Sequence, residues 1–120
     1  MKIAVTGAEA DLWAPVDQRF GRARFLLVVD LETNALHVHD NEINLNATQG
    51  AGIQTAQNVA RLEVQAVLTG HLGPNAHRVL KAAGIEIFTG LEGSCAEALE
   101  AFRTGKLAAA DSADVEGHWI

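Results

Sequence analysis

Three features of the 120-residue sequence predict a three-layer α/β/α domain built on a mixed five-stranded sheet. Short apolar runs rich in β-branched residues, such as Leu26 to Val29, are typical of strands buried on both faces. In the second half of the chain such runs alternate with helical patterns, so we expect right-handed crossovers and parallel pairing. The first two connections between strands allow one antiparallel strand in the same sheet.

The first half of the sequence contains three expected strands. The first covers Lys2 to Thr6 and ends at a glycine turn. A polar loop from Glu9 to Arg22 follows, and a loop of this length without periodicity is typical of a functional segment. The second and third strands cover Phe25 to Asp30 and Leu36 to Asp40, joined by a turn at Thr33-Asn34.

The second half alternates helices with strands, and turn residues mark the boundaries. A helix is expected from Gln49 or Gly50 to about Glu63, and a strand from Ala66 to Thr69. The remaining elements are a helix opened by Gly73-Pro74 and closed by Gly84, a strand over Ile85 to Phe88, and a last helix that begins with the capping box Ser94 to Glu97.

Composition narrows the function classes. Nine Lys and Arg against fifteen Asp and Glu give a formal net charge of -6, which argues against nucleic acid as a partner. No apolar run approaches the roughly twenty residues that span a bilayer, so no membrane association is expected. The single cysteine excludes an internal disulfide framework and is typical of a cytoplasmic protein. We expect one domain over residues 1–105 and a flexible tail over 106–120, since the tail lacks periodicity.

Three arginines and several glycine turns point to a ligand that is anionic. Ligands of open α/β sheets lie beyond the carboxyl ends of the parallel strands, where helix N-termini offer N–H donors to an anion. Arginine adds a planar fork of donors, and glycine lets the backbone approach the ligand. The expected binding residues are Arg19, Gly21, Arg22, Arg24, Thr48, Gly50, Gly52, Gly70, His71 and Gly73.

His71 and Cys95 are the candidate metal contacts. His71 lies in the Gly70 to Gly73 turn, and Cys95 begins a helix, where the dipole favours a thiolate. His37 and His39 share one strand face and could chelate a metal or simply form an exposed polar face. No nucleophile has an evident base, so we expect a binding protein and not an enzyme.

The segment Val16 to Ala23, with Phe25 and Asp30 after it, resembles the Phe-Gly-Arg signature of the dinitrogenase iron-molybdenum cofactor biosynthesis family. The later landmarks Gly50 to Ile53, Gly70 to Gly73 and Gly84-Ile85 resemble that family in order and spacing. The resemblance implies a ribonuclease H-like fold. It also implies noncovalent binding or carriage of an anionic molybdenum-containing metal-sulfide cluster, a molybdenum-copper sulfide being favoured and an iron-molybdenum cofactor precursor possible.

Two departures from the family pattern limit what is carried over. Many relatives have histidine where this chain has Arg19, which implies a charge contact in place of a ligand. The cysteine-rich radical domain of some relatives is missing from this sequence, so cluster assembly by radical chemistry is not expected.

Two alternative functions use other features of the sequence. A scaffold or regulatory protein would dock cytoplasmic protein partners through the acidic tail and Trp119, with no bound cluster. A magnesium-dependent ribonuclease H-like nuclease would need clustered carboxylates, for which Asp30 and Asp40 are the candidates.

Overall fold

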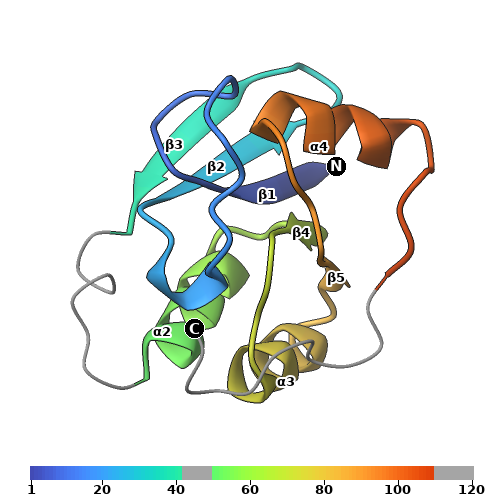
Figure 1. Ribbon diagram of the computed structural model, residues 1–120. Coiled ribbons are helices and arrows are strands. Elements are labelled where there is room, and N and C mark those ends of the chain that lie inside the picture. The colour runs from blue at the N-terminus through green and yellow to red at the C-terminus, as the bar shows by residue number, and fades with distance from the viewer. Residues whose placement is uncertain (42–49, 110–120) are drawn as a thin grey trace.

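The computed structural model describes residues 1–41 and 50–109 and contains the predicted sequence of elements (Figure 1). The expected contact Thr48 and the expected helix start at Gln49 lie outside these ranges. The elements are β1 (Lys2–Gly7), the 3-10 helix η1 (Phe20–Arg22), β2 (Phe25–Asp30), β3 (Leu36–Asp40), α2 (Ala51–Arg61), β4 (Ala66–Leu68), α3 (Pro74–Ala82), β5 (Glu86–Phe88) and α4 (Cys95–Arg103).

The five strands form one mixed sheet in the order β3-β2-β1-β4-β5. β2 runs antiparallel to both of its neighbours, β1 and β3, whereas β4 pairs parallel with β1 and with β5. The prediction of a mixed sheet with one antiparallel strand is therefore confirmed. The ribonuclease H-like label stays a prediction.

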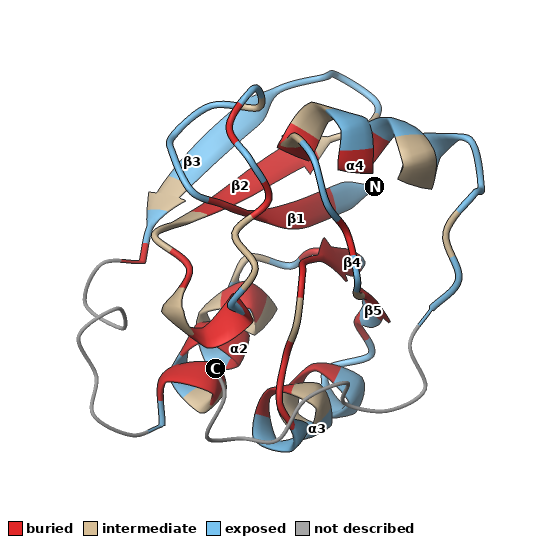
Figure 2. Cartoon of the chain, in the orientation of Figure 1, coloured by how far each residue is buried: buried red, intermediate tan, exposed pale blue. Residues whose placement is uncertain are grey.

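Helices cover both faces of the sheet, with α2 and α3 on one side and α4 on the other (Figure 1). Because strand side chains alternate between faces, the central strands supply two separate apolar layers, which Figure 2 shows as buried red segments. On β1, Ala4 belongs to the layer under α2 and α3, and Ile3 and Val5 belong to the layer under α4. One apolar core on each face of the sheet thus joins the sheet to the helices that cover that face.

The predicted helix boundaries are reproduced where capping chemistry sets them. Ser94 accepts a hydrogen bond from the Glu97 backbone N–H at 3.1 Å, and the Glu97 side chain accepts from the Ser94 N–H at 3.0 Å. Pro74 occupies the first turn of α3, where its missing N–H costs nothing. Gly84 follows α3 with φ of 75°, a left-handed conformation that glycine adopts without strain.

The chain just beyond the expected boundary at residue 105 packs against the domain. Leu107, which falls in the predicted tail, is partly buried against the layer under α4. Residues 110–120, which make up most of that tail, lie outside the described residues. In the described ranges, no helix has both the length and the apolar character needed to cross a membrane.

Candidate anion-binding site at the carboxyl edge of the sheet

Most of the predicted site residues lie on segments that meet at the carboxyl edge of β1 and β4. Gly7, the last residue of β1, pairs with Phe25, so the start of antiparallel β2 lies at this same edge. The chain leaves β4 at Leu68 and enters the Gly70 to Gly73 turn there. The N-termini of α2 and α3 are both capped by glycine, and neither first turn carries an acidic residue. This end of the sheet is therefore suited to negative charge.

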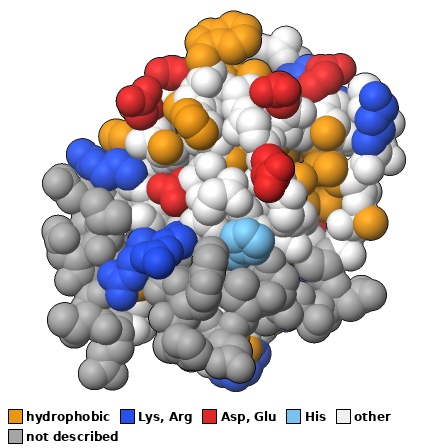
Figure 3. Space-filling view, in the orientation of Figure 1, with side chains coloured by type: hydrophobic (Ala, Val, Ile, Leu, Met, Phe, Trp, Pro, Cys, Tyr) orange, Lys and Arg blue, Asp and Glu red, His pale blue; other side chains and the backbone are white. Residues whose placement is uncertain are grey.

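Arg19 and His71 are brought together by backbone pairing. The Phe20 N–H donates to the His71 carbonyl at 3.0 Å, and the His71 N–H donates to the Gln18 carbonyl at 2.9 Å. These two bonds form a short parallel bridge between Arg19 and His71, 52 positions apart in sequence (71 minus 19). Arg19 is exposed and His71 is half-buried. In Figure 3, Lys and Arg side chains gather near a histidine on this face of the molecule.

Two buried threonines anchor the loop that carries Arg19. The Thr6 hydroxyl donates to the Asp17 carbonyl at 3.0 Å and lies 2.8 Å from the Thr69 hydroxyl. Because Thr6 donates to Asp17, Thr69 is the donor of the second bond. Thr6 is the penultimate residue of β1, Thr69 directly follows β4, and both are fully buried. Sequence patterns did not identify these threonines as functional, since each one looks like an ordinary polar residue at the end of an apolar strand.

The glycines at this edge allow three segments to pack closely. A Cβ on Gly21 would lie 2.8 Å from the Gly52 nitrogen and 2.9 Å from its Cα, so η1 rests directly on the first turn of α2. A Cβ on Gly70 would lie 2.6 Å from the Gln18 Cα. Gly21 and Gly70 are thus needed for contact between chain segments, whereas the sequence had suggested open backbone for a ligand.

The backbone around Arg22 is held by two buried side chains that sequence patterns also missed. The Thr55 hydroxyl donates to the Gly21 carbonyl at 3.0 Å, and the Asn41 Nδ2 donates to the Ala23 carbonyl at 2.9 Å. Asn41 Nδ2 also donates to Thr55 Oγ1 at 3.1 Å. Since the carbonyls on both sides of Arg22 are held from α2 and from the end of β3, the position of this arginine is set by tertiary contacts.

Arg24 is engaged within the sheet. Its guanidinium forms an ion pair and hydrogen bond with Asp40. The same group lies 4.5 Å from the centre of the Phe25 ring, a cation-π contact. Arg24 therefore has a structural role in joining β2 to β3.

The expectation that Cys95 carries a thiolate is wrong. Cys95 is fully buried in the layer under α4, and its Sγ lies 3.8 Å from the Thr6 carbonyl oxygen and 3.7 Å from that of Pro15. Burial, with smaller contributions from the charges of Asp11 and Asp17, raises the pKa of this thiol to about 11. Loss of solvation outweighs the helix dipole, so we leave Cys95 out of the candidate site.

Carboxylates in the described ranges do not gather as the nuclease alternative requires. Asp30 pairs with Lys2 at one end of β2, while Asp40 pairs with Phe25 at the other. At about 3.3 Å per residue, the two carboxylates are on the order of 16 Å apart along the sheet. Nowhere in residues 1–41 and 50–109 do three His, Cys, Asp or Glu side chains come close enough to hold a metal ion.

The fold and the Phe-Gly-Arg turn together identify the protein family to which the chain belongs. The model of the family described as dinitrogenase iron-molybdenum cofactor matches residues 1–105, and the chain belongs to this family. The match includes every described residue of the candidate site.

Two solved structures of similar proteins share the whole architecture. The apo form of the orange protein from Desulfovibrio gigas is 37% identical with a TM-score of 0.93, covering 95% of this chain and 96% of that one. A putative NifB protein from Thermotoga is 28% identical with a TM-score of 0.83, covering 97% and 98%. An uncharacterized protein of Methanocaldococcus jannaschii is 29% identical over 91 residues, which is 73% of this chain and 76% of that protein. Family and neighbours indicate binding or carriage related to the iron-molybdenum cofactor.

Proposed function

We propose that this protein binds or carries, noncovalently, an anionic molybdenum-containing metal-sulfide cluster at the carboxyl edge of β1 and β4. A molybdenum-copper sulfide is the favoured cargo, and a precursor of the iron-molybdenum cofactor is the other member of this class. In this proposal the protein has no catalytic activity, holds or carries its cluster, and acts in a complex with cytoplasmic protein partners.

The observation that carries the proposal is the bridge that places Arg19 beside His71. It joins the Phe-Gly-Arg loop to the turn that opens α3, so Arg19, His71 and the N-terminus of α3 lie on neighbouring segments. Charge-assisted donors of this kind suit the sulfides of an anionic cluster. Arg19, Arg22 and His71 are the proposed side-chain contacts, and the α2 and α3 N-termini at Gly50 to Gly52 and Gly73 are the proposed backbone contacts.

The first test is reconstitution of the apo-protein under anaerobic conditions with tetrathiomolybdate and copper. The proposal expects stoichiometric molybdenum and copper after gel filtration, together with sulfide-to-metal charge-transfer bands in the visible spectrum. Protein that stays colourless and metal-free after this treatment would contradict the proposal and favour the scaffold alternative.

Arginine substitutions locate the site. Arg22→Ala should weaken tetrathiomolybdate binding about tenfold or more, because it removes a charge-assisted contact worth about 1.5–3 kcal/mol. Arg103→Ala is the matched control, since Arg103 lies in α4 and donates to Asn34 Oδ1 at 2.8 Å, remote from this edge. Equal losses in the two variants, measured by titration of the visible bands, would place the cluster elsewhere.

A further inference from the structure

The two histidines of the edge strand β3 lie on the sheet face that carries α2 and α3, where His39 is partly buried and His37 is exposed. His37 pairs with Val28 and His39 with Leu26, and both partners belong to the apolar layer under α2 and α3. Leu36 and Val38 therefore lie on the other face, where they are 38% and 41% exposed. An amphipathic edge strand would be expected to turn its apolar side toward the helices, so the presence of two histidines on the helix-bearing face needs another explanation.

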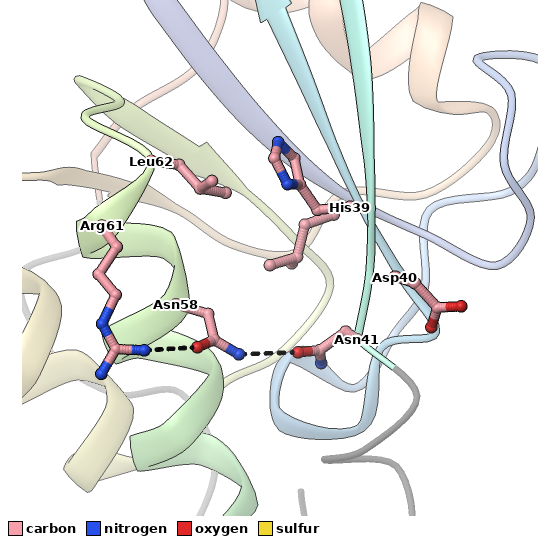
Figure 4. Close-up of a pocket in the computed structure, with 7 residues that line it drawn as sticks. His39, Asp40, Asn41, Asn58, Arg61 and Leu62 are labelled. Carbon is pink, nitrogen blue, oxygen red and sulfur yellow. Dashed lines mark hydrogen bonds between the residues drawn. The ribbon is translucent and has the colours of Figure 1, made fainter.

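Both imidazoles border a groove between β3 and the end of α2, which Figure 4 shows in close-up for the part beside His39. Two adjoining pockets of about 290 and 320 Å³ form this groove, and both are lined by His39, Arg61 and Leu62. His37 lines the larger pocket, with Glu63 across from it. The hydrogen bonds and ion pairs described for residues 1–41 and 50–109 include none made by either imidazole.

The surroundings of the groove are compatible with a cation. The carboxyl end of α2 lies here, and the partial negative charge at a helix C-terminus attracts positive charge. Glu63 follows with φ of 58°, a left-handed conformation that costs a non-glycine residue about 1 kcal/mol, and its carboxylate borders the same pocket as the two histidines.

Two positive side chains also border the groove. The Arg61 guanidinium is turned away from the imidazoles, because it donates to Asn58 Oδ1 at 3.1 Å (Figure 4). Lys2 is exposed, lines the larger pocket and opposes Glu63 in charge. Asp40 lines the smaller pocket, so the formal charges that border the groove, Lys2 and Arg61 against Glu63 and Asp40, balance.

We propose that His37 and His39 together bind a borderline divalent metal ion, such as Zn²⁺, Cu²⁺ or Ni²⁺, in the groove between β3 and α2. Residues two apart on a strand have Cα atoms about 6–7 Å apart on the same face, so their imidazoles can converge on one ion. Nitrogen ligands suit these three metals, and water completes the coordination. This site is separate from the cluster site and does not depend on the proposed function.

The test is titration of the full chain with Zn²⁺ alone by isothermal calorimetry. The proposal expects one saturable site, weakened at least tenfold in His37→Ala and in His39→Ala, because either change leaves a single imidazole. His77→Ala is the matched control, since His77 lies on α3 away from the groove, and it should bind Zn²⁺ as the unchanged protein does. The Cu²⁺-loaded protein should show two imidazole nitrogen couplings by electron paramagnetic resonance.

Three results would overturn this assignment. They are no saturable Zn²⁺ binding by the unchanged protein, equal binding by the His37→Ala/His39→Ala double variant, and loss of binding in His77→Ala alone. Circular dichroism of each variant separates loss of a ligand from loss of the fold. Because the probe is a simple metal ion, failure here leaves the tetrathiomolybdate result unaffected.

Discussion

At the scale of single residues, Gly21 explains why the Phe-Gly-Arg turn needs glycine at its centre. The φ of Gly21 does not require glycine. The space beside it does, because the Gly52 backbone occupies the position that a Cβ would take. Hydrogen is the only substituent that lets η1 rest on α2. The glycine therefore acts through packing, and the arginine beside it supplies the charge.

Gly21→Ala should lower the free energy of unfolding by about 1–3 kcal/mol, because a Cβ would press on the Gly52 backbone, which cannot move aside as a side chain could. The measurement is urea denaturation followed by circular dichroism. Gly90→Ala is the comparison, since no atom lies within 4 Å of its added Cβ and only the left-handed φ of 75° opposes it. A smaller loss for Gly21→Ala than for Gly90→Ala would contradict this account.

The Cys95 thiol should make stability depend on alkaline pH. Its folded pKa, near 11, lies above the ordinary value of 9.0, so the folded state keeps a proton that the unfolded state loses first. Stability is therefore fully present below pH 9 and falls as the pH rises towards 11, by at most about 1.4 kcal/mol per pH unit. Urea denaturation between pH 8 and 11 should show a shallower decline for Cys95→Ala than for the unchanged protein.

The candidate site could be predicted from the sequence only in part, and the physical reason differs between residues. Arginines and a glycine-flanked histidine stand out in an acidic chain, so Arg19 and His71 could be identified as candidates. Thr55 and Asn41 could not, because their hydrogen-bond partners are loop carbonyls that only the folded chain brings near. Cys95 was misjudged, since a helix start is visible in the sequence but burial of its side chain is not.

At the scale of elements, the order of helices and strands along the chain and the presence of one antiparallel strand followed from short apolar runs, their alternation with helical patterns, and capping residues. The orientation of β3 did not follow. The alternation of polar and apolar residues from Leu36 to Asp40 predicts that the strand has one polar and one apolar face. It does not predict which of these faces lies on the side of the sheet covered by α2 and α3. That choice is set by register with β2, which places His37 and His39 toward α2.

The contact between α2 and η1 should depend on the Thr55 hydroxyl. Thr55→Val keeps the shape but leaves the buried Gly21 carbonyl without its donor, which costs about 1–3 kcal/mol. Thr55→Ser restores the hydroxyl and should recover most of this loss. Amide hydrogen exchange around Arg22 should quicken in Thr55→Val and return toward the original rate in Thr55→Ser. Equal exchange in all three proteins would show that the turn is held by other contacts.

At the scale of the whole molecule, two apolar layers share one sheet, and the chain beyond α4 contributes to the second of them. Removal of residues 110–120 leaves Leu107 in place and serves as the reference for a longer truncation. Removal from Lys106 onward also deletes Leu107 and the bond from the Lys106 N–H to the Ala101 carbonyl at 3.0 Å. The longer truncation should therefore melt several degrees lower by differential scanning calorimetry. Equal melting temperatures would restore the boundary at residue 105.

The central position of β1 also governs the order in which the protein can fold during synthesis. β1 is made first, yet its parallel partner β4 follows far along the chain, as the 63-residue separation of the bonded pair Thr6 and Thr69 illustrates. Antiparallel β2 and β3 can pair with β1 early, but one edge of that three-stranded intermediate stays open until β4 has left the ribosome. Nascent chains in which β4 has not yet emerged therefore expose one edge of β1, and they are the species that chaperones would meet.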